Sequence, residues 1–118
     1  PKTISALDNG AFANCTKLKS VTLGTATTEI SAKAFKGCSV LKSVTVPAKV
    51  KSIGSCAFYK SGVKTLTVKS TKLTKAGVKD CLKGSNVTTV KVPKSKLKAY
   101  KGLFTKYVCG KTVKVVAA

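Results

Sequence analysis

Apolar positions along the chain recur with a spacing of 23 residues. Segments 7–23 and 30–46 carry apolar residues at the same five slots: Phe12 and Phe35, Cys15 and Cys38, Leu18 and Leu41, Val21 and Val44, Leu23 and Val46. A period between about 20 and 50 residues is the sequence signature of a repeat array. The pattern therefore predicts a chain built from similar units that stack on one another.

The prolines indicate where one unit ends and the next begins. Each of Pro1, Pro47 and Pro93 comes 11 residues before an aromatic residue, namely Phe12, Phe58 and Phe104. Division at this position gives five units in one domain: 1–23, 24–46, 47–68, 69–92 and 93–118. Because Pro1 coincides with a unit boundary and is not Met, we expect the sequence to be the C-terminal part of a longer array.

Each unit ends in a segment that alternates between apolar and polar residues and is rich in β-branched side chains, which is typical of a β-strand. The expected inward pairs are Val21/Leu23, Val44/Val46, Leu66/Val68, Val90/Val92 and Val113/Val115. Between them lie two polar rows: Ser20, Ser43, Thr65, Thr89 and Thr112, and Thr22, Thr45 and Thr67 continued by Lys91 and Lys114. If the strands stack in register, these rows follow the exposed face of a parallel sheet.

An Ala-Phe pair precedes each of the first three strands, as in Ala11–Phe12, Ala34–Phe35 and Ala57–Phe58. The segment is too short for an independent helix, so it predicts one helical turn held by a buried Phe. Longer helices are expected over Lys75–Leu82 and over Ser95–Lys106, where Leu97, Tyr100, Leu103, Phe104 and Tyr107 follow a spacing of three and four. The last unit is then a cap of helix, loop around Gly110 and final strand Thr112–Val116.

The sequence I-x-x-x-A-F-x-x-C-x-x-L-x-x-V-x-[LV]-P, read in Ile30–Pro47, resembles the leucine-rich repeats of the BspA type. The resemblance covers nearly the whole chain, although Ser61 replaces the Cys and one residue is missing before Val63 and Val87. It implies a β-rich leucine-rich-repeat solenoid with parallel strands, one short helical turn per repeat and a C-terminal helix-plus-strand cap. It also implies a secreted or cell-surface bacterial protein that attaches to host or extracellular components.

The repeat pattern predicts the residues of the buried ladder: Phe12, Phe35, Phe58, Cys15, Cys38, Val21, Val44, Leu66, Val90 and Val113. Cys81 occupies the slot of Ala34 and should also be buried, whereas Cys56 shares a slot with Lys33 and should be the most exposed thiol. Cys15 and Cys38 in neighbouring units are within disulfide range on strand spacing alone, but small buried thiols are the commoner outcome.

The charge of the chain is strongly positive. All 23 basic residues are Lys, against three acidic residues, and the formal net charge is +20. Such a charge favours anionic partners, although a Lys-rich surface also keeps a repeat protein soluble. The absence of Arg disfavours specific phosphate recognition. Nucleic acid is an unlikely partner because Tyr59, Tyr100 and Tyr107 are not interleaved with the Lys rows. No apolar run is long enough to span a membrane, and no signal peptide is visible.

Two groups of lysines are candidate polyanion contacts, with a solvated surface as the alternative interpretation. Lys19, Lys42 and Lys64 share one slot in successive units, and a second group at the expected last helix comprises Lys94, Lys96, Lys98 and Lys101. In adjacent strands the members of the first group would lie about 5 Å apart.

The sequence offers no catalytic, metal-binding or cofactor-binding pattern. The five Cys have no metal-ligand spacing and no His is present, while Asp8, Glu29 and Asp80 fall at different phases of three units. We therefore expect a non-enzymatic module without metal or cofactor. The resemblance to the BspA-type repeats implies that this module mediates adhesion or protein–protein interaction with an extracellular or host protein. The alternatives are a Lys-rich module that binds an anionic glycan or cell-wall polymer, and a structural spacer without a ligand.

Overall fold

The computed structural model describes residues 3–4, 12–19 and 21–118 of the chain. Its strands are β1 (Thr3–Ile4), β2 (Thr22–Leu23), β3 (Glu29–Ile30), β4 (Ser43–Val46), β5 (Ser52–Ile53), β6 (Thr65–Val68), β7 (Thr89–Val92) and β8 (Lys114–Ala117). Its helices are the 3₁₀-helices η1 (Ala76–Val78) and η2 (Lys94–Lys96) and the α-helices α1 (Leu97–Lys101) and α2 (Lys106–Cys109). Leu7, Asp8, Ala11 and Ser20 lie outside the described residues.

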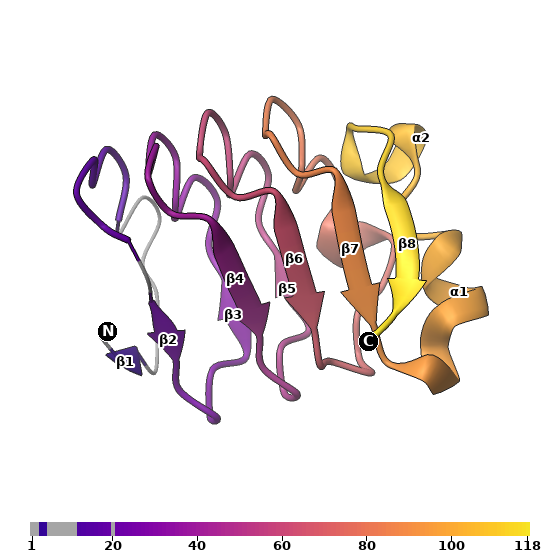
Figure 1. Ribbon diagram of the computed structural model, residues 1–118. Coiled ribbons are helices and arrows are strands. Elements are labelled where there is room, and N and C mark those ends of the chain that lie inside the picture. Colours follow the sequence, from indigo (N-terminus) through magenta and orange to yellow (C-terminus); the bar gives the residue numbers. More distant parts are fainter. Residues whose placement is uncertain (1–2, 5–11, 20) are drawn as a thin grey trace.

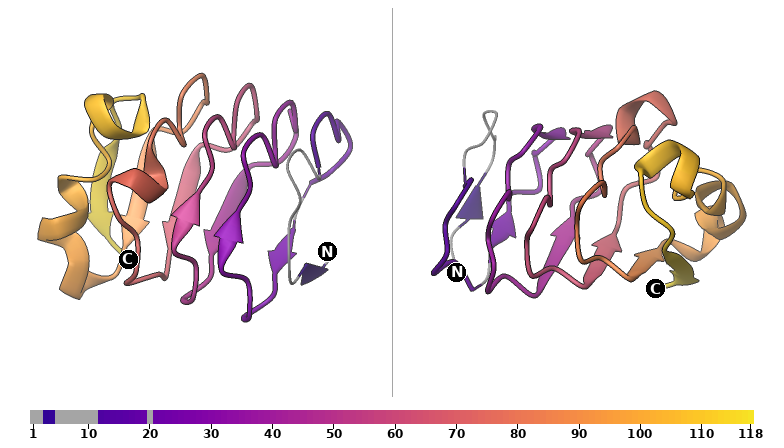
Figure 2. Two further views of the ribbon diagram at one scale, coloured as in Figure 1. Left: turned by 180° about the vertical axis from the view of Figure 1, so that it is seen from behind. Right: turned by 90° about the horizontal axis from the view of Figure 1, so that it is seen from above.

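Strands β4, β6, β7 and β8 form one parallel sheet in this order (Figure 1). Val44 lies opposite Leu66 and Leu66 lies opposite Val90, which is the register that the repeat predicts. Between successive strands the backbone returns along the opposite side of the molecule, where β3 pairs in parallel with β5 (Figure 2). The predicted parallel strands are thus confirmed, and we call each turn of the backbone a coil.

The first coil departs from the predicted sheet. Within the described ranges β2 pairs with β1 alone and not with β4. The first coil does bond to the second at its turn, where the N–H of Phe12 donates to the carbonyl of Ala34 over 2.9 Å. Its Cys15, Leu18 and Val21 are only half-buried, so less apolar contact holds its strand against β4.

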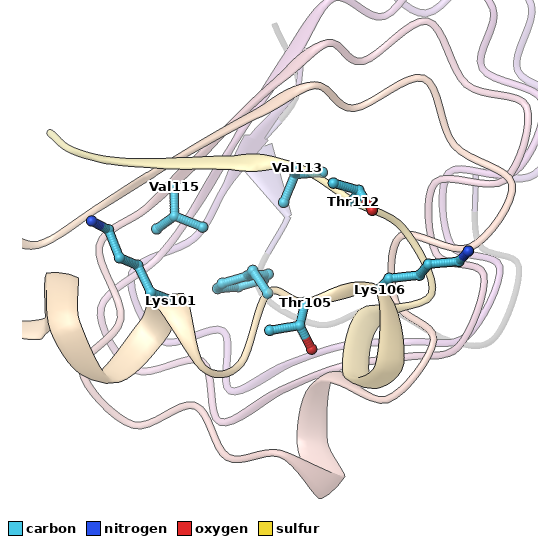
Figure 3. A pocket seen from close by; sticks show the side chains of 7 residues that line it. Lys101, Thr105, Lys106, Thr112, Val113 and Val115 are labelled. Carbon is cyan, nitrogen blue, oxygen red and sulfur yellow. The ribbon is translucent and has the colours of Figure 1, made fainter.

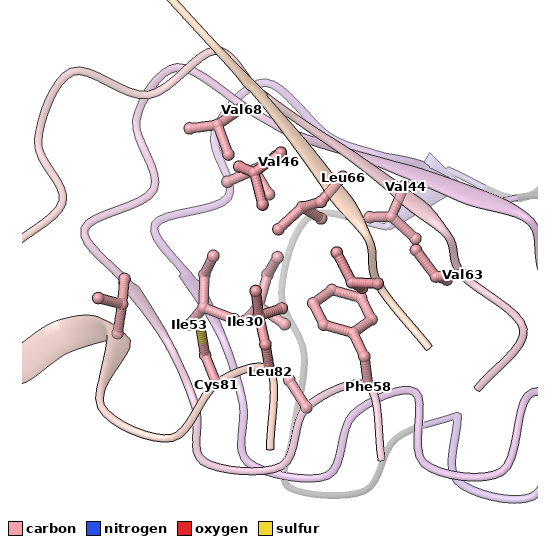
Figure 4. Close-up of a cluster of buried hydrophobic side chains, with 14 of the residues drawn as sticks. Ile30, Val44, Val46, Ile53, Phe58, Val63, Leu66, Val68, Cys81 and Leu82 are labelled. Atoms are coloured by element: carbon pink, nitrogen blue, oxygen red, sulfur yellow. The ribbon is translucent and has the colours of Figure 1, made fainter. Parts of the chain in front are cut away.

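The core follows the Phe ladder. The rings of Phe12 and Phe35 stack with centroids 5.7 Å apart, and those of Phe35 and Phe58 stack at 5.6 Å. The inward side chains of the strands, including Val44 and Leu66, close the core from the sheet side (Figure 4). Each of these coils contributes one Phe ring and inward aliphatic side chains to the core, and these groups contact their counterparts in the next coil. The buried core is therefore continuous from coil to coil.

The segment around each Phe forms consecutive turns and not the predicted helical turn. The N–H of Ala34 donates to the carbonyl of Ser31, and Lys33 has a left-handed φ of 59°. Other N–H groups donate sideways, as when Phe35 N–H bonds the carbonyl of Ala57 over 2.8 Å. These bonds between coils satisfy the backbone where a helix would use its own carbonyls, so within the described coils the segment does not become helical.

The two longer predicted helices are both wrong in extent. Over Lys75–Leu82 only η1 is helical, and the Thr74 hydroxyl accepts a hydrogen bond from the N–H of Gly77 at its start. Over Ser95–Lys106 the chain forms the end of η2, then α1, and a break before α2. The Thr105 side chain accepts from the N–H of Val108 and thereby starts α2 as a separate helix. Tyr107, predicted on the apolar face, is 95% exposed.

The register of the last strand differs from the prediction by two residues. Val115, and not Val113, lies opposite Val90, and the strand begins at Lys114. Thr112 therefore does not continue the row of Thr89, and Val113 lies before the strand as a half-buried side chain against the core. A shift by two residues keeps the same face inward, so the alternation of side chains does not oppose it. The end of α2 and the turn at Gly110, with φ 87°, determine where the strand begins.

Candidate interaction surface

The outward face of the sheet carries short hydroxyl side chains in two rows. Ser43, Thr65 and Thr89 lie opposite one another in β4, β6 and β7, and Thr45 lies opposite Thr67. Ser43 and Thr45 are exposed, while the three Thr side chains in β6 and β7 are half-buried. Each hydroxyl both donates and accepts hydrogen bonds, so this face can pair with polar groups of either kind.

Two members of the first Lys group lie on neighbouring coils. The N–H of Lys64 donates to the carbonyl of Lys42 over 3.1 Å, and both side chains are exposed. Lys19 is also exposed. On the other side the row ends at Thr88, whose N–H donates to the carbonyl of Lys64 over 2.9 Å. At such spacing two exposed ammonium groups repel by about 1 kcal/mol or less in water, so the row is stable without a bound anion.

The second Lys group does not lie on one helix. Lys94 and Lys96 belong to η2, whereas Lys98 and Lys101 belong to α1. Lys96 is half-buried and the other three are exposed. The four residues therefore belong to two consecutive helices of different type, and their role as polyanion contacts stays a prediction.

Tyr59 forms a cluster with two lysines that the sequence interpretation missed. The ammonium groups of Lys36 and Lys60 lie 5.9 and 5.5 Å from the centroid of the ring. A Cβ at Gly84 would lie 2.2 Å from this ring, so the ring requires Gly at that position. The repeat register contains the signal, because Lys36 precedes Tyr59 by 23 residues and occupies the same slot. Contacts of this kind at exposed sites contribute about 0.5–1 kcal/mol.

A groove of 540 Å³ opens where β2 and β4 are not paired. Leu23, Pro47 and Ala48 supply its apolar surface, and the side chains of Lys49 and Lys69 are exposed at its border. Thr45 belongs to both this groove and the outward face of the sheet. The outward face of the sheet therefore continues into this groove, whose lining is partly apolar and whose border is basic.

The five cysteines are all free thiols. Burial raises the pKa of the Cys38 and Cys109 thiols, and it raises the pKa of Cys81 well above the ordinary value of 9.0. Cys38 donates a hydrogen bond to the Phe12 carbonyl over 3.0 Å. Cys15 and Cys56 are both half-buried, whereas the other three thiols are buried. The predicted exposure of Cys56 is thus matched by Cys15. The three buried thiols stay protonated and are poor nucleophiles at neutral pH.

In the part of the chain that the structure describes, no three His, Cys, Asp or Glu side chains gather as a metal site. Among the same residues, no helix has the length and apolar character that a membrane crossing requires.

Parallel strands on one side, turns on the other and one stacked Phe per coil of 23 residues define a leucine-rich-repeat protein. The family model described as the BspA type leucine-rich repeat region (6 copies) matches residues 1–111, and the chain belongs to this family. The resemblance found in the sequence is thereby confirmed. Leucine-rich repeats generally serve as non-enzymatic, protein-binding modules, and the BspA type is generally extracellular or surface-associated. Comparisons with curated proteins and with solved structures found no match.

Proposed function

We propose that the chain is a non-enzymatic leucine-rich-repeat solenoid of a secreted or cell-surface bacterial protein, and that it mediates adhesion by binding an extracellular or host protein. The contact surface is the outward face of the sheet formed by β4, β6 and β7, with the adjoining groove beside β2. In this proposal the last unit, with α1, α2 and β8, serves as the cap of the solenoid.

The observation that supports this surface most strongly is the pair of in-register hydroxyl rows. Ser and Thr side chains lose little rotamer entropy when a partner immobilises them, so the side-chain ordering contribution to the cost of binding is small. A regular sheet also holds them at fixed spacing, which favours a rigid complementary surface.

A pair of double variants tests this assignment. Thr45→Lys with Thr67→Lys places two long charged side chains on the proposed contact face. Ser39→Lys with Thr71→Lys makes the same charge change at exposed positions outside the strands. Binding of the wild type and both variants to a panel of purified extracellular-matrix and serum proteins is measured by biolayer interferometry.

We expect a panel protein that binds the wild type and the control pair alike, with affinity for the sheet-face variant reduced about tenfold or more. Equal binding by the two variants would exclude the sheet face as the contact surface. A panel without any specific binder would contradict the adhesion role and favour the structural spacer.

A second candidate function is polyanion binding, which the adjacent Lys42 and Lys64 favour. Three carboxylates cannot neutralise 23 ammonium groups, so the surface keeps a large positive charge. Heparin is the probe, and elution from a heparin column with increasing salt is the measurement. Lys19, Lys42 and Lys64 are replaced by Gln in one variant, and the exposed Lys72, Lys75 and Lys79 are replaced in the control. Earlier elution of the first variant than of the control supports the row, and identical elution rules out a specific role for it.

A further inference from the structure

The last strand of the sheet has one edge without a partner strand in the described chain. β8 pairs with β7 and is the terminal strand in the order β4, β6, β7, β8. The N–H groups of Lys114 and Ala118 donate to the carbonyls of Thr88 and Val92, which belong to the β7 side. Because backbone groups alternate in direction along a strand, the N–H and C=O groups of Val115 and Ala117 face the opposite edge. This edge therefore presents backbone donors and acceptors in the spacing of a parallel ladder.

A groove of 400 Å³ runs beside the same edge, between β8 and the segment from the end of α1 to the start of α2 (Figure 3). Phe104, Val113 and Val115 form its apolar floor. Val113 and Val115 project from the β8 side toward the facing segment, and both are half-buried (Figure 3). An apolar side chain of an incoming strand could therefore occupy the groove while the backbone pairs with β8.

Both ends of the groove are basic. The side chains of Lys101 and Lys106 lie at its opposite ends, and both residues are exposed (Figure 3). The exposed Lys114 adds a third ammonium group on β8 itself. An occupant with carboxylates on either side of an apolar centre would match this distribution of charge.

The charge also excludes the other obvious occupants. A second copy of the chain would bring another formal charge of +20 to the edge, so copies repel one another. An anionic polysaccharide has no peptide N–H and C=O groups at strand spacing and would leave the β8 edge unpaired. We propose that an extended acidic segment of a partner protein adds to β8 as a further parallel strand, with an apolar side chain in the groove and carboxylates at Lys101 and Lys106. This site is separate from the outward face of the sheet, so the sheet-face variants described above leave it unchanged.

The test uses a fluorescein-labelled peptide, Asp-Asp-Val-Thr-Val-Asp-Asp, and measures its dissociation constant by fluorescence anisotropy. A second peptide of the same sequence carries N-methyl groups on the Thr and on the Asp that follows the second Val, because the N–H groups of these residues face β8 when the Val side chains enter the groove. The methyl groups keep the charge and remove these backbone donors. A third peptide has Lys in place of each Asp. We expect the first peptide to bind the wild type, the N-methylated peptide to bind about tenfold more weakly, and the Lys peptide not to bind.

Protein variants locate the binding on this edge. Val115→Pro removes an N–H that does not bond β7, so the ladder to β7 stays intact while pairing with a new strand is lost. Lys101→Ala with Lys106→Ala removes the charges at the groove ends, and Lys94→Ala with Lys98→Ala is a matched control of equal charge. We expect peptide affinity to fall about three- to tenfold in the first two proteins and to change less than twofold in the control.

Equal affinity for the methylated and unmethylated peptides would overturn strand addition, and this arm needs no mutant that must fold. Equal effects of the two Lys pairs would show binding by net charge alone and would also overturn the proposal. Sedimentation velocity without peptide examines self-association. A wild-type dimer that Val115→Pro abolishes would assign the edge to a second copy and refute the acidic partner.

Discussion

Tyr100 ties the C-terminal helices to the fourth coil by two hydrogen bonds. Its hydroxyl donates to the carbonyl of Ser70 over 2.8 Å and accepts from the N–H of Leu73 over 3.2 Å. The side chain is 3% exposed, and its ring meets Phe104 edge-on with centroids 6.2 Å apart. The substitution Tyr100→Phe removes the hydroxyl and keeps the ring, so it isolates the two bonds.

The loss of stability caused by this substitution depends on the two backbone groups that lose their hydrogen-bond partner. Ser70 and Leu73 are both buried, so water does not readily replace the lost phenol oxygen. A buried backbone group without a partner costs about 1–3 kcal/mol, and two such groups give an expected loss of about 2–6 kcal/mol. This is a substantial part of the 5–15 kcal/mol that is typical of a folded domain. Tyr107→Phe is the matched control, because Tyr107 is 95% exposed and should change stability by less than about 0.5 kcal/mol.

Urea unfolding followed by far-UV circular dichroism measures both variants, since the chain contains no Trp. We expect the midpoint of Tyr100→Phe to fall with an unchanged dependence on urea, and the midpoint of Tyr107→Phe to stay at the wild-type value. If the two variants unfold at the same urea concentration, the hydroxyl of Tyr100 does not hold the helices to the coil and the reasoning fails.

Three further predictions concern the core, the coil spacing and the thiols. Phe35→Ala should cost about 3–5 kcal/mol in urea unfolding, and Phe12→Ala should cost less because the Phe12 ring is 9% exposed and belongs to the first coil, where Cys15, Leu18 and Val21 are only half-buried; equal losses would contradict this reasoning. Gly54→Ala should lower the melting temperature, because the new Cβ would lie 2.1 Å from the backbone of the preceding coil, whereas Gly102→Ala, with its nearest atom at 3.4 Å, should leave it nearly unchanged. Stability should fall as pH rises past the ordinary thiol value of 9.0, because the unfolded chain releases protons that burial of Cys81 retains in the folded state; a stability independent of alkaline pH in urea titrations would refute this.

The sequence was sufficient for those parts of the fold that depend on local periodicity. Phe12, Phe35 and Phe58 recur every 23 residues, and their rings stack because each coil places the same slot at the same height. The alternation in β4, β6 and β7 predicted both the inward face and the register, since each of these strands follows a turn of nearly constant length. In a repeat array every contact has a neighbouring copy, so one unit carries the information for the next.

The candidate surface was predictable to a similar extent. The hydroxyl rows and the neighbouring Lys42 and Lys64 follow directly from the repeat register. The Tyr59 cluster follows from the same register, because Lys36 and Tyr59 occupy one slot in neighbouring coils. Whether these surfaces bind a partner is a separate question that the proposed experiments address.

The last unit was determined by tertiary structure. A two-residue shift of β8 leaves the same side chains facing the core, so alternation alone could not distinguish Val113 from Val115 as the partner of Val90. The apolar spacing of Ser95–Lys106 suited one helix, yet the Thr105 cap and the Tyr100 hydrogen bonds divide it and hold α1 against the preceding coil. The periodic residues thus specified the repeating coils through local spacing, whereas the structure of residues 93–118 depended on contacts between residues about 30 positions apart, which no local pattern encodes.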